Sequence, residues 1–197
     1  SAITLMQGER TSNALAHVSA RTSDHAKVRD EIQQTLHELQ DSSKLTPLLR
    51  AELLEINEAT LVEYNASKIA EIIIKNLIPE TQIIVKNSKS DSEATFKTGC
   101  NFIVGGNSIG RGVTIPKLNT VLYTRLSKRP QADTIWQHNR IFGYDRNRKL
   151  IRVYMTKHLW KLLSEINDQN ESIYAQIRAG IKNLLPAGNL TNSKRSG

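Results

Sequence analysis

The chain has little of what secreted or membrane proteins depend on. Its 197 residues contain a single cysteine, Cys100, which excludes an internal disulfide and fits a reducing cytosol. No apolar run approaches the roughly 18 to 20 residues of a membrane-spanning helix. No charged stretch followed by an apolar one, the pattern of a signal peptide, opens the sequence. With 39% hydrophobic residues and a mean hydropathy of −0.41, we expect a soluble, cytoplasmic chain with no membrane partner.

Two motifs of nucleotide hydrolysis are also missing. There is no GxxxxGKS or GxxxxGKT loop, and no acidic pair of the DEAD or DExx type follows an apolar strand. The chain therefore lacks the lysine and the magnesium-holding carboxylate with which P-loop ATPases bind their substrate. A metal site is not expected either, because His17 and His25 have no cysteine or carboxylate partners at ligand spacing.

Positive charge is what the chain has in excess, and it is unevenly placed. The net charge is +8, and between residues 107 and 161 twelve Lys and Arg face only Asp133 and Asp145. Such a basic half predicts a polyanionic partner: nucleotide phosphates, nucleic acid, or both. The alternative is a basic surface that only interacts with solvent.

Apolar periodicity predicts an α/β fold with a mainly parallel sheet. Expected strands cover residues 14–19, 81–86, 102–104, 121–126 and 150–155, and expected helices 24–40, 45–54, 59–77 and 157–177. Ser23 or Asp24 is expected to cap the first long helix, and Pro47 to lie in the first turn of the second. Ligands of such sheets gather at the carboxyl ends of the strands, where we expect residues 17–19, 105–111, 126–129 and 155–158. Cys100, Trp136 and Trp160 are interpreted as core residues, with base stacking the alternative for the two tryptophans.

Residues 101–148 combine the features that suit phosphate binding. A short apolar run stops at Gly105 and Gly106, and the turn continues as NSIGRGVTIP. A second apolar run follows, and then a short helix is expected from about Ala132 to Gly143 with Gln137 and Arg140 on one face. Glycines let backbone N–H groups approach an anion, and arginines add charge and a fork of donors. The alternatives are a purely structural turn and an ordinary salt bridge at Arg140.

This stretch resembles a known family. GGNSIGRGVTIP is similar to helicase motif V of superfamily 2, and QHNRIFGYDR is similar to its motif VI. The two in this order, with a strand between them, most resemble the Z-one (Z1) domain, which is the partner of a DEAD-type ATPase lobe in the helicase-like subunits of CglI-type ATP-dependent restriction endonucleases. The resemblance covers roughly residues 17–174 and implies a RecA-like lobe.

The resemblance implies roles for individual residues. Gln137 and Arg140 match motif VI as catalytic residues, whereas Arg146 takes the place of the second arginine only with irregular spacing, since position 143 is glycine. Arg111, Gly112 and Thr114 fall on the nucleotide-binding part of motif V, although Thr114 replaces the usual acidic or amide residue. The loop after the first strand, like motif IV, implies DNA contacts. The implied DNA-binding residues are Ser19, Arg21, Asn107, Ser108, Arg125, Lys128 and Arg129. His17 and His25 are either coupling residues between nucleotide and DNA or structural histidines.

The expected function is that of the second motor lobe of an ATP-dependent translocase on double-stranded DNA that serves a restriction endonuclease. ATP and magnesium would be held mainly by a first lobe absent from this chain, and a separate nuclease subunit would be a further partner. The chain alone would then not be an enzyme. We expect a leading segment 1–13, the lobe 14–180, and a tail or linker 181–197, in a piece of a longer protein. The alternatives are a non-catalytic DNA-binding and subunit-assembly module and, ranked below it for want of a nuclease motif, an endonuclease.

Overall fold

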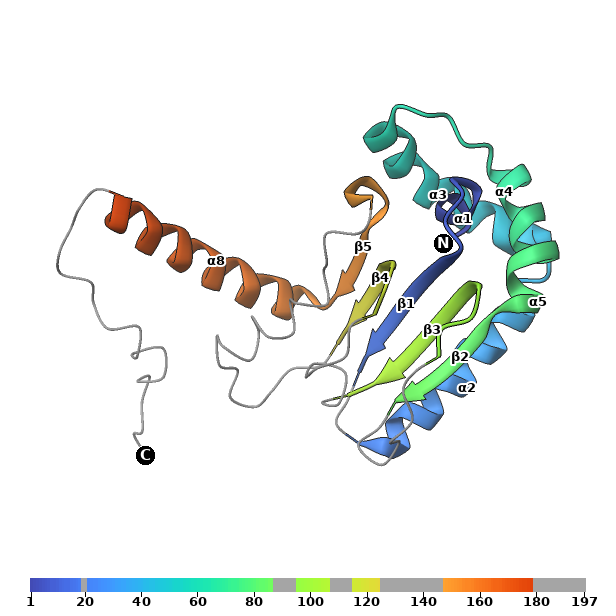
Figure 1. Cartoon of the computed structure of the whole chain (residues 1–197), viewed down its shortest axis with the longest axis horizontal. Coiled ribbons are helices and arrows are strands. Elements are labelled where there is room, and N and C mark those ends of the chain that lie inside the picture. The colour runs from blue at the N-terminus through green and yellow to red at the C-terminus, as the bar shows by residue number, and fades with distance from the viewer. Residues whose placement is uncertain (19–20, 87–94, 107–114, 125–146, 179–197) are drawn as a thin grey trace. The chain divides into compact units, whose positions relative to one another are not determined.

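A computed structural model describes residues 1–18, 21–86, 95–106, 115–124 and 147–178 of the chain. Its centre is a sheet of five strands in the order β2-β3-β1-β4-β5, and all neighbouring pairs are parallel (Figure 1). The strands are β1 (Thr11–His17), β2 (Gln82–Lys86), β3 (Gly99–Gly105), β4 (Leu118–Tyr123) and β5 (Arg152–Met155). The predicted α/β class is confirmed, and the arrangement is a RecA-like fold.

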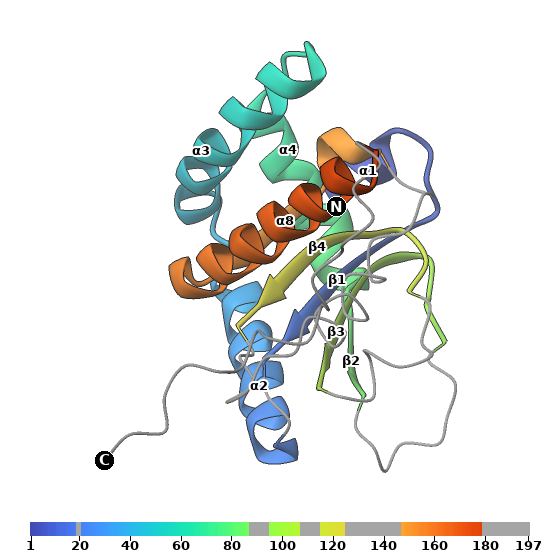
Figure 2. The same cartoon turned by 90° about the vertical axis from the view of Figure 1, so that its left-hand side faces the viewer.

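The chain divides into two compact units, Ser1–Thr156 and Lys157–Gly197. The first unit carries the sheet, and α2 runs beside β2 and β3 while α3 and α4 pack on each other (Figures 1 and 2). Its described helices are α1 (Ala2–Met6), α2 (Thr22–Glu38), α3 (Ser42–Thr60), α4 (Ala66–Ile72), a π-helical turn (Ile73–Leu77), α5 (Ile78–Glu80) and a 3-10 turn (Arg148–Leu150). In the second unit, the long helix α8 (Lys157–Arg178) confirms the predicted C-terminal helix.

Two apolar clusters hold the first unit together. In the sheet, Leu15 is the register partner of both Ile103 and Val121, and all three side chains are buried. Ile115 and Leu118 complete this cluster, so strands β3, β1 and β4 share one continuous core. The second cluster joins α1, α3, α4 and the 3-10 turn through Ala2, Ile3, Leu53, Ile69 and Leu150. α1 is therefore part of the folded unit, although residues 2–6 show no clear period in the sequence.

Several predicted boundaries were wrong for identifiable reasons. α2 begins at Thr22 with Arg21 in the N-cap position, so neither Ser23 nor Asp24 caps it. Asp41 accepts a hydrogen bond from the Ser43 amide at 2.9 Å and starts α3 three residues before Leu45, which moves Pro47 into the helix interior.

The predicted helix over 59–77 is instead divided among α3, α4 and the π-helical turn. α3 ends where Leu61 adopts a left-handed conformation (φ 58), and α4 starts only after Asn65, whose side chain caps Lys68.

The predicted strands needed smaller corrections. β1 begins at Thr11, three residues before the expected start, and β4 is 118–123 rather than 121–126. The interpretation of Cys100 as a core residue is confirmed, because it is 3% exposed. The same interpretation is wrong for Trp160, which is 64% exposed on α8, and Trp136 lies outside the described residues. None of the described helices is long and apolar enough to cross a membrane.

Candidate functional site at the carboxyl edge of the sheet

Because all five strands are parallel, their carboxyl ends meet at one edge, which we call the carboxyl edge. The register gives its members directly: Gly105 pairs with Lys86 on one side and with His17 on the other, and Tyr123 lies between His17 and Met155. The prediction that residues 17, 105 and 155 gather at such an edge is confirmed. Each segment of the chain that follows one of these residues therefore starts from a defined position along the carboxyl edge.

His17 occupies the middle of this edge and is fully buried. Its ring stacks on that of Tyr123, with centroids 5.0 Å apart and an interplanar angle of 29°. The Thr124 amide donates to the His17 carbonyl at 3.2 Å and continues the pairing one residue past β4. The glycine at position 105 has no side chain to crowd His17 from the other side. His17 is thus fixed between the ends of β3 and β4.

Two other residues named from the sequence lie at the start of α2, which is the next described element after β1. Arg21 is exposed at the N-cap of the helix, and His25 is buried one turn further on. The N-terminal end of a helix carries a partial positive charge from its free backbone N–H groups. Arg21 adds a full positive charge at the same place, so this point next to the carboxyl edge favours an anion.

The remaining residues named from the sequence lie outside the described residues. These are Ser19, Asn107, Ser108, Arg111, Gly112, Thr114, Arg125, Lys128, Arg129, Gln137, Arg140 and Arg146. Their chain positions are still informative. Ser19 follows β1, residues 107–114 follow β3, and residues 125–146 follow β4.

A set of buried amides, which the sequence analysis did not single out, lies toward the opposite end of the strands. Asn13 and Asn101 are register partners on β1 and β3, and neither is exposed to solvent. The Asn101 amide donates to Asn13 Oδ1 at 2.9 Å and to the Lys97 carbonyl at 3.0 Å, and it accepts from the Lys97 N–H at 3.3 Å. Asn13 in turn donates to the Pro116 carbonyl. Buried amides need such partners, and here the partners are the last residues of the connections that return to β3 and β4.

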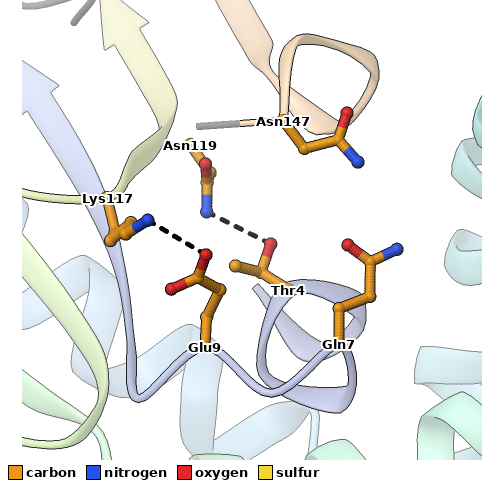
Figure 3. Close-up of a pocket in the computed structure, with 6 residues that line it drawn as sticks. All are labelled: Thr4, Gln7, Glu9, Lys117, Asn119 and Asn147. Carbon is orange, nitrogen blue, oxygen red and sulfur yellow. Dashed lines mark hydrogen bonds and ion pairs between the residues drawn. The ribbon is translucent and has the colours of Figure 1, made fainter. Parts of the chain in front are cut away.

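A third buried amide, Asn119 on β4, ties α1 to the sheet. Its Nδ2 donates to Thr4 Oγ1 at 3.1 Å and to Ser12 Oγ at 3.2 Å. Beside it lies a polar cavity of about 100 Å³ at the amino ends of β1 and β4. Its lining is Thr4, Gln7, Glu9, Lys117, Asn119 and Asn147 (Figure 3). Within this lining, the Lys117 ammonium and the Glu9 carboxylate form an ion pair at 3.0 Å.

One sequence signal could have revealed these amides. Asn13, Asn101 and Asn119 each interrupt or flank an apolar stretch that forms a largely buried strand. An uncharged polar residue at such a position is retained only with a hydrogen-bond partner. Starting the first strand at Ala14 excluded Asn13 from it, and so hid the pairing.

Two residues on strands of the sheet, Cys100 on β3 and Tyr154 on β5, have shifted pKa values. Burial raises the pKa of the Cys100 thiol, which makes the thiolate unfavourable. Burial, and then the hydrogen bond that its phenol donates to Glu52 at 3.0 Å, raise the pKa of Tyr154 to about 12. Among the residues that the structure describes, no three His, Cys, Asp or Glu side chains come together as a metal site.

Comparison with known proteins gives one family. The family model of the Z1 domain matches residues 1–189. No curated protein and no solved structure matches the chain.

Proposed function

Since this chain belongs to the Z1 domain family, we propose that it is the second RecA-like lobe of a DEAD-type motor. The motor hydrolyses ATP and translocates along double-stranded DNA in the service of a restriction endonuclease, with a nuclease subunit as partner. ATP and magnesium bind mainly to a first lobe, and this lobe closes on them. Its own contributions are an arginine directed at the γ-phosphate and contacts to DNA phosphates.

One observation carries the proposal. Every residue named from the sequence as a site residue lies at the end of, or follows, β1, β3 or β4, and these three strands are adjacent in the sheet although they are not consecutive in the chain. β2, which intervenes in the sequence, lies at the edge of the sheet, and no named residue follows it. The segments with motif-like sequences therefore start side by side at the carboxyl edge, as a shared ligand requires.

The roles follow from the chemistry of each segment. Arg140, with Gln137 and the irregularly spaced Arg146, acts on the transition state of hydrolysis, because a planar guanidinium meets two phosphate oxygens and stays charged. Arg111, Gly112 and Thr114 contact the nucleotide. DNA phosphates are contacted by Ser19, Arg21, Asn107, Ser108, Arg125, Lys128 and Arg129. The exposed Arg21 at the start of α2 supports this set, because it adds charge to a helix N-terminus.

His17 and His25 are proposed to couple the two ligands. His17 stacks on the last residue of β4 and adjoins the last residue of β3. A movement of the segment after β3 or of the segment after β4 would therefore act on the buried His17 ring. The interior position of both histidines excludes direct contact with a large ligand in this conformation, and so favours coupling over binding.

The competing proposal is a non-catalytic DNA-binding and assembly module. It is favoured by apolar side chains on the surface of α3 and at its end, where Leu54 is 73% and Leu61 87% exposed. The two proposals differ in one measurable property. A motor lobe is needed for hydrolysis by the first lobe, whereas an assembly module is not.

The deciding experiment is Arg140→Ala in the protein that contains both lobes. Fingers of this kind contribute on the order of 10³–10⁵ in rate in other phosphate-transfer systems. We expect DNA-stimulated ATPase to be abolished while the affinities for ATP and DNA are largely kept, because the arginine acts on charge that develops in the transition state.

Arg146→Ala is the matched control. Activity in Arg140→Ala with loss in Arg146→Ala would show that the roles of the two arginines are reversed. Full activity in both variants would leave the assembly module as the better proposal.

A further inference from the structure

The helix α8 carries a stripe of side chains with the spacing of a coiled coil. Five apolar residues and one asparagine recur along it at alternating steps of four and three residues: Leu159, Leu163, Ile166, Asn170, Ile173 and Ile177. This is the seven-residue repeat of helices that wind around each other, in which the core positions are called a and d. The stripe has three a positions, 163, 170 and 177, and three d positions, 159, 166 and 173.

The charges of α8 all lie away from this stripe. Its acidic and basic residues occupy only positions b, c and f, on the outer side of a coiled coil: Lys157, Lys161, Glu165, Asp168, Glu171 and Arg178. The positions e and g, which flank the stripe, hold uncharged side chains: Trp160, Leu162, Asn167, Gln169, Tyr174 and Gln176. Two copies of α8 can therefore meet along the stripe without bringing like charges together.

The stripe is covered at its start and open at its end. Leu159 is buried and Ile166 is half-buried. Further along, Ile173 is 37% and Ile177 51% exposed, and Tyr174 beside them is exposed as well. Positions 173, 174 and 177 lie on one side of a single helical turn, so they form a contiguous apolar patch. A stripe that packed only on the core of its own chain would be buried along its whole length.

We propose that α8 of a second copy of the chain covers this patch, in a parallel two-stranded coiled coil. In a two-fold dimer of this kind the same surface of both copies meets, so each a or d side chain faces its counterpart. Asn170 identifies the partner, because a buried amide opposite another Asn170 finds a hydrogen bond, whereas opposite an apolar side chain it loses one.

Asn170 also sets the number of strands. Isoleucine at d positions 166 and 173 favours three or four strands by itself, and an asparagine at an a position restricts the assembly and its register. The dimer requires neither nucleotide nor DNA, and so it goes beyond the proposed function and is tested separately from it.

Sedimentation equilibrium of the full chain, without nucleotide or DNA, tests the dimer. The mass should rise from 22.1 kDa toward twice that value between micromolar and submillimolar concentration, because a few helical turns associate weakly. Ile173→Asp should weaken association at least about a hundredfold, since each dimer loses two buried isoleucines and gains two facing like charges. Ala175→Asp is the matched control. It places the same charge at an exposed f position of the same turn and should leave association unchanged.

Two further variants test the register and the orientation. Asn170→Ile should tighten association and raise the mass beyond that of two chains, because it removes the polar a position. Ile177→Cys places two thiols opposite each other at the end of a parallel dimer, within reach of a disulfide. This variant should form a covalent dimer under mild oxidation, whereas the wild type, whose Cys100 is buried, should not.

A chain that stays monomeric up to submillimolar concentration would overturn the proposal. A dimer that Ile173→Asp weakens no more than Ala175→Asp does would overturn it as well, because the contact would then lie elsewhere. Association that Asn170→Ile weakens or leaves unchanged would contradict the a position, and a dimer without cross-linking in Ile177→Cys would contradict the parallel orientation. Both aspartates replace exposed residues and lie equally close to the C-terminal end of the helix, so circular dichroism should show the same helix content in the two variants.

Discussion

The buried amide pair makes a quantitative prediction for Asn101→Ala. The variant loses three hydrogen bonds, to the Lys97 N–H, the Lys97 carbonyl and Asn13 Oδ1. A neutral hydrogen bond contributes about 1 kcal/mol net, and a buried group left without its partner costs about 1–3 kcal/mol. We therefore expect the free energy of unfolding to fall by about 2–4 kcal/mol. For a chain of this size that corresponds to a decrease in Tm of roughly 6–12 °C.

Urea unfolding followed by circular dichroism at the helix band measures this change. The midpoint should move to lower urea at an unchanged slope, because the variant alters stability and not the surface exposed on unfolding. Gln34→Ala is the matched control. It removes an amide whose single hydrogen bond, to Glu38 at 3.0 Å, lies on the exposed side of α2, and the loss should stay within about 0.5 kcal/mol.

A double-mutant cycle sharpens the prediction. Asn13→Ala and Asn101→Ala together should cost less than the sum of the single changes, because both remove the same hydrogen bond. A loss in Asn101→Ala no larger than in Gln34→Ala would refute the reasoning that these amides anchor the returning connections. Strict additivity in the cycle would refute the pairing itself.

Three further predictions concern the chain alone. The phenol of Tyr154 has a pKa of about 12 in the folded chain, against 10 for an ordinary tyrosine. Its contribution to stability is therefore complete below pH 10 and is lost as the pH rises through 12. A difference titration of tyrosinate absorbance between the wild type and Tyr154→Phe checks this pKa, and a midpoint near 10 would contradict it. The isolated chain should show no ATPase activity, since it has neither a Walker lysine nor a DEAD-type acidic pair, and measurable turnover by pure chain would overturn the two-lobe proposal. The isolated chain should bind duplex DNA weakly and without sequence preference. The logarithm of its binding constant should fall with the logarithm of the salt concentration, with a slope of about −0.9 per phosphate contact. Arg21→Ala should reduce the size of that slope by about one unit, and a wild-type slope near zero would count against phosphate contacts.

The sequence predicts the fold class well because the two periodicities that specify it are local. The alternation around Leu15 and the β-branched run of β2 each identify a strand without knowledge of the rest of the chain. Helix ends were harder to predict, because several neighbouring residues can compete to cap a helix. Asp41 started α3 before the predicted Leu45, and the left-handed Leu61 and the cap Asn65 interrupted the apolar stripe across 59–77.

The strand order could not be read from the sequence. β2 follows β1 in the chain but lies two strands away, because the connection through α2 to α5 carries it past β3. Only non-local pairing shows that β1 adjoins both β3 and β4. For the same reason the partner of each buried asparagine was hidden, since 88 residues separate Asn13 from Asn101.

The positions of His17 and of the amide pair lead to one physical argument about the proposed motor. Each connection after β2 and β3 starts at the carboxyl edge and must return across the sheet to the amino end of the next strand. Parallel crossovers usually place a helix there, whose packing fixes both ends. In the described parts of these two connections, 95–98 and 115–117, side-chain amides and an ion pair hold the residues next to the strands. Hydrogen bonds are directional, so they hold a returning backbone at a defined register more tightly than apolar contact does. The residues that lead into β3 and β4 are therefore held at the amino ends of these strands, at the opposite end of the sheet from His17. In the proposed motor, we expect this frame to keep the register of β3, β1 and β4 unchanged while nucleotide binds at the carboxyl edge.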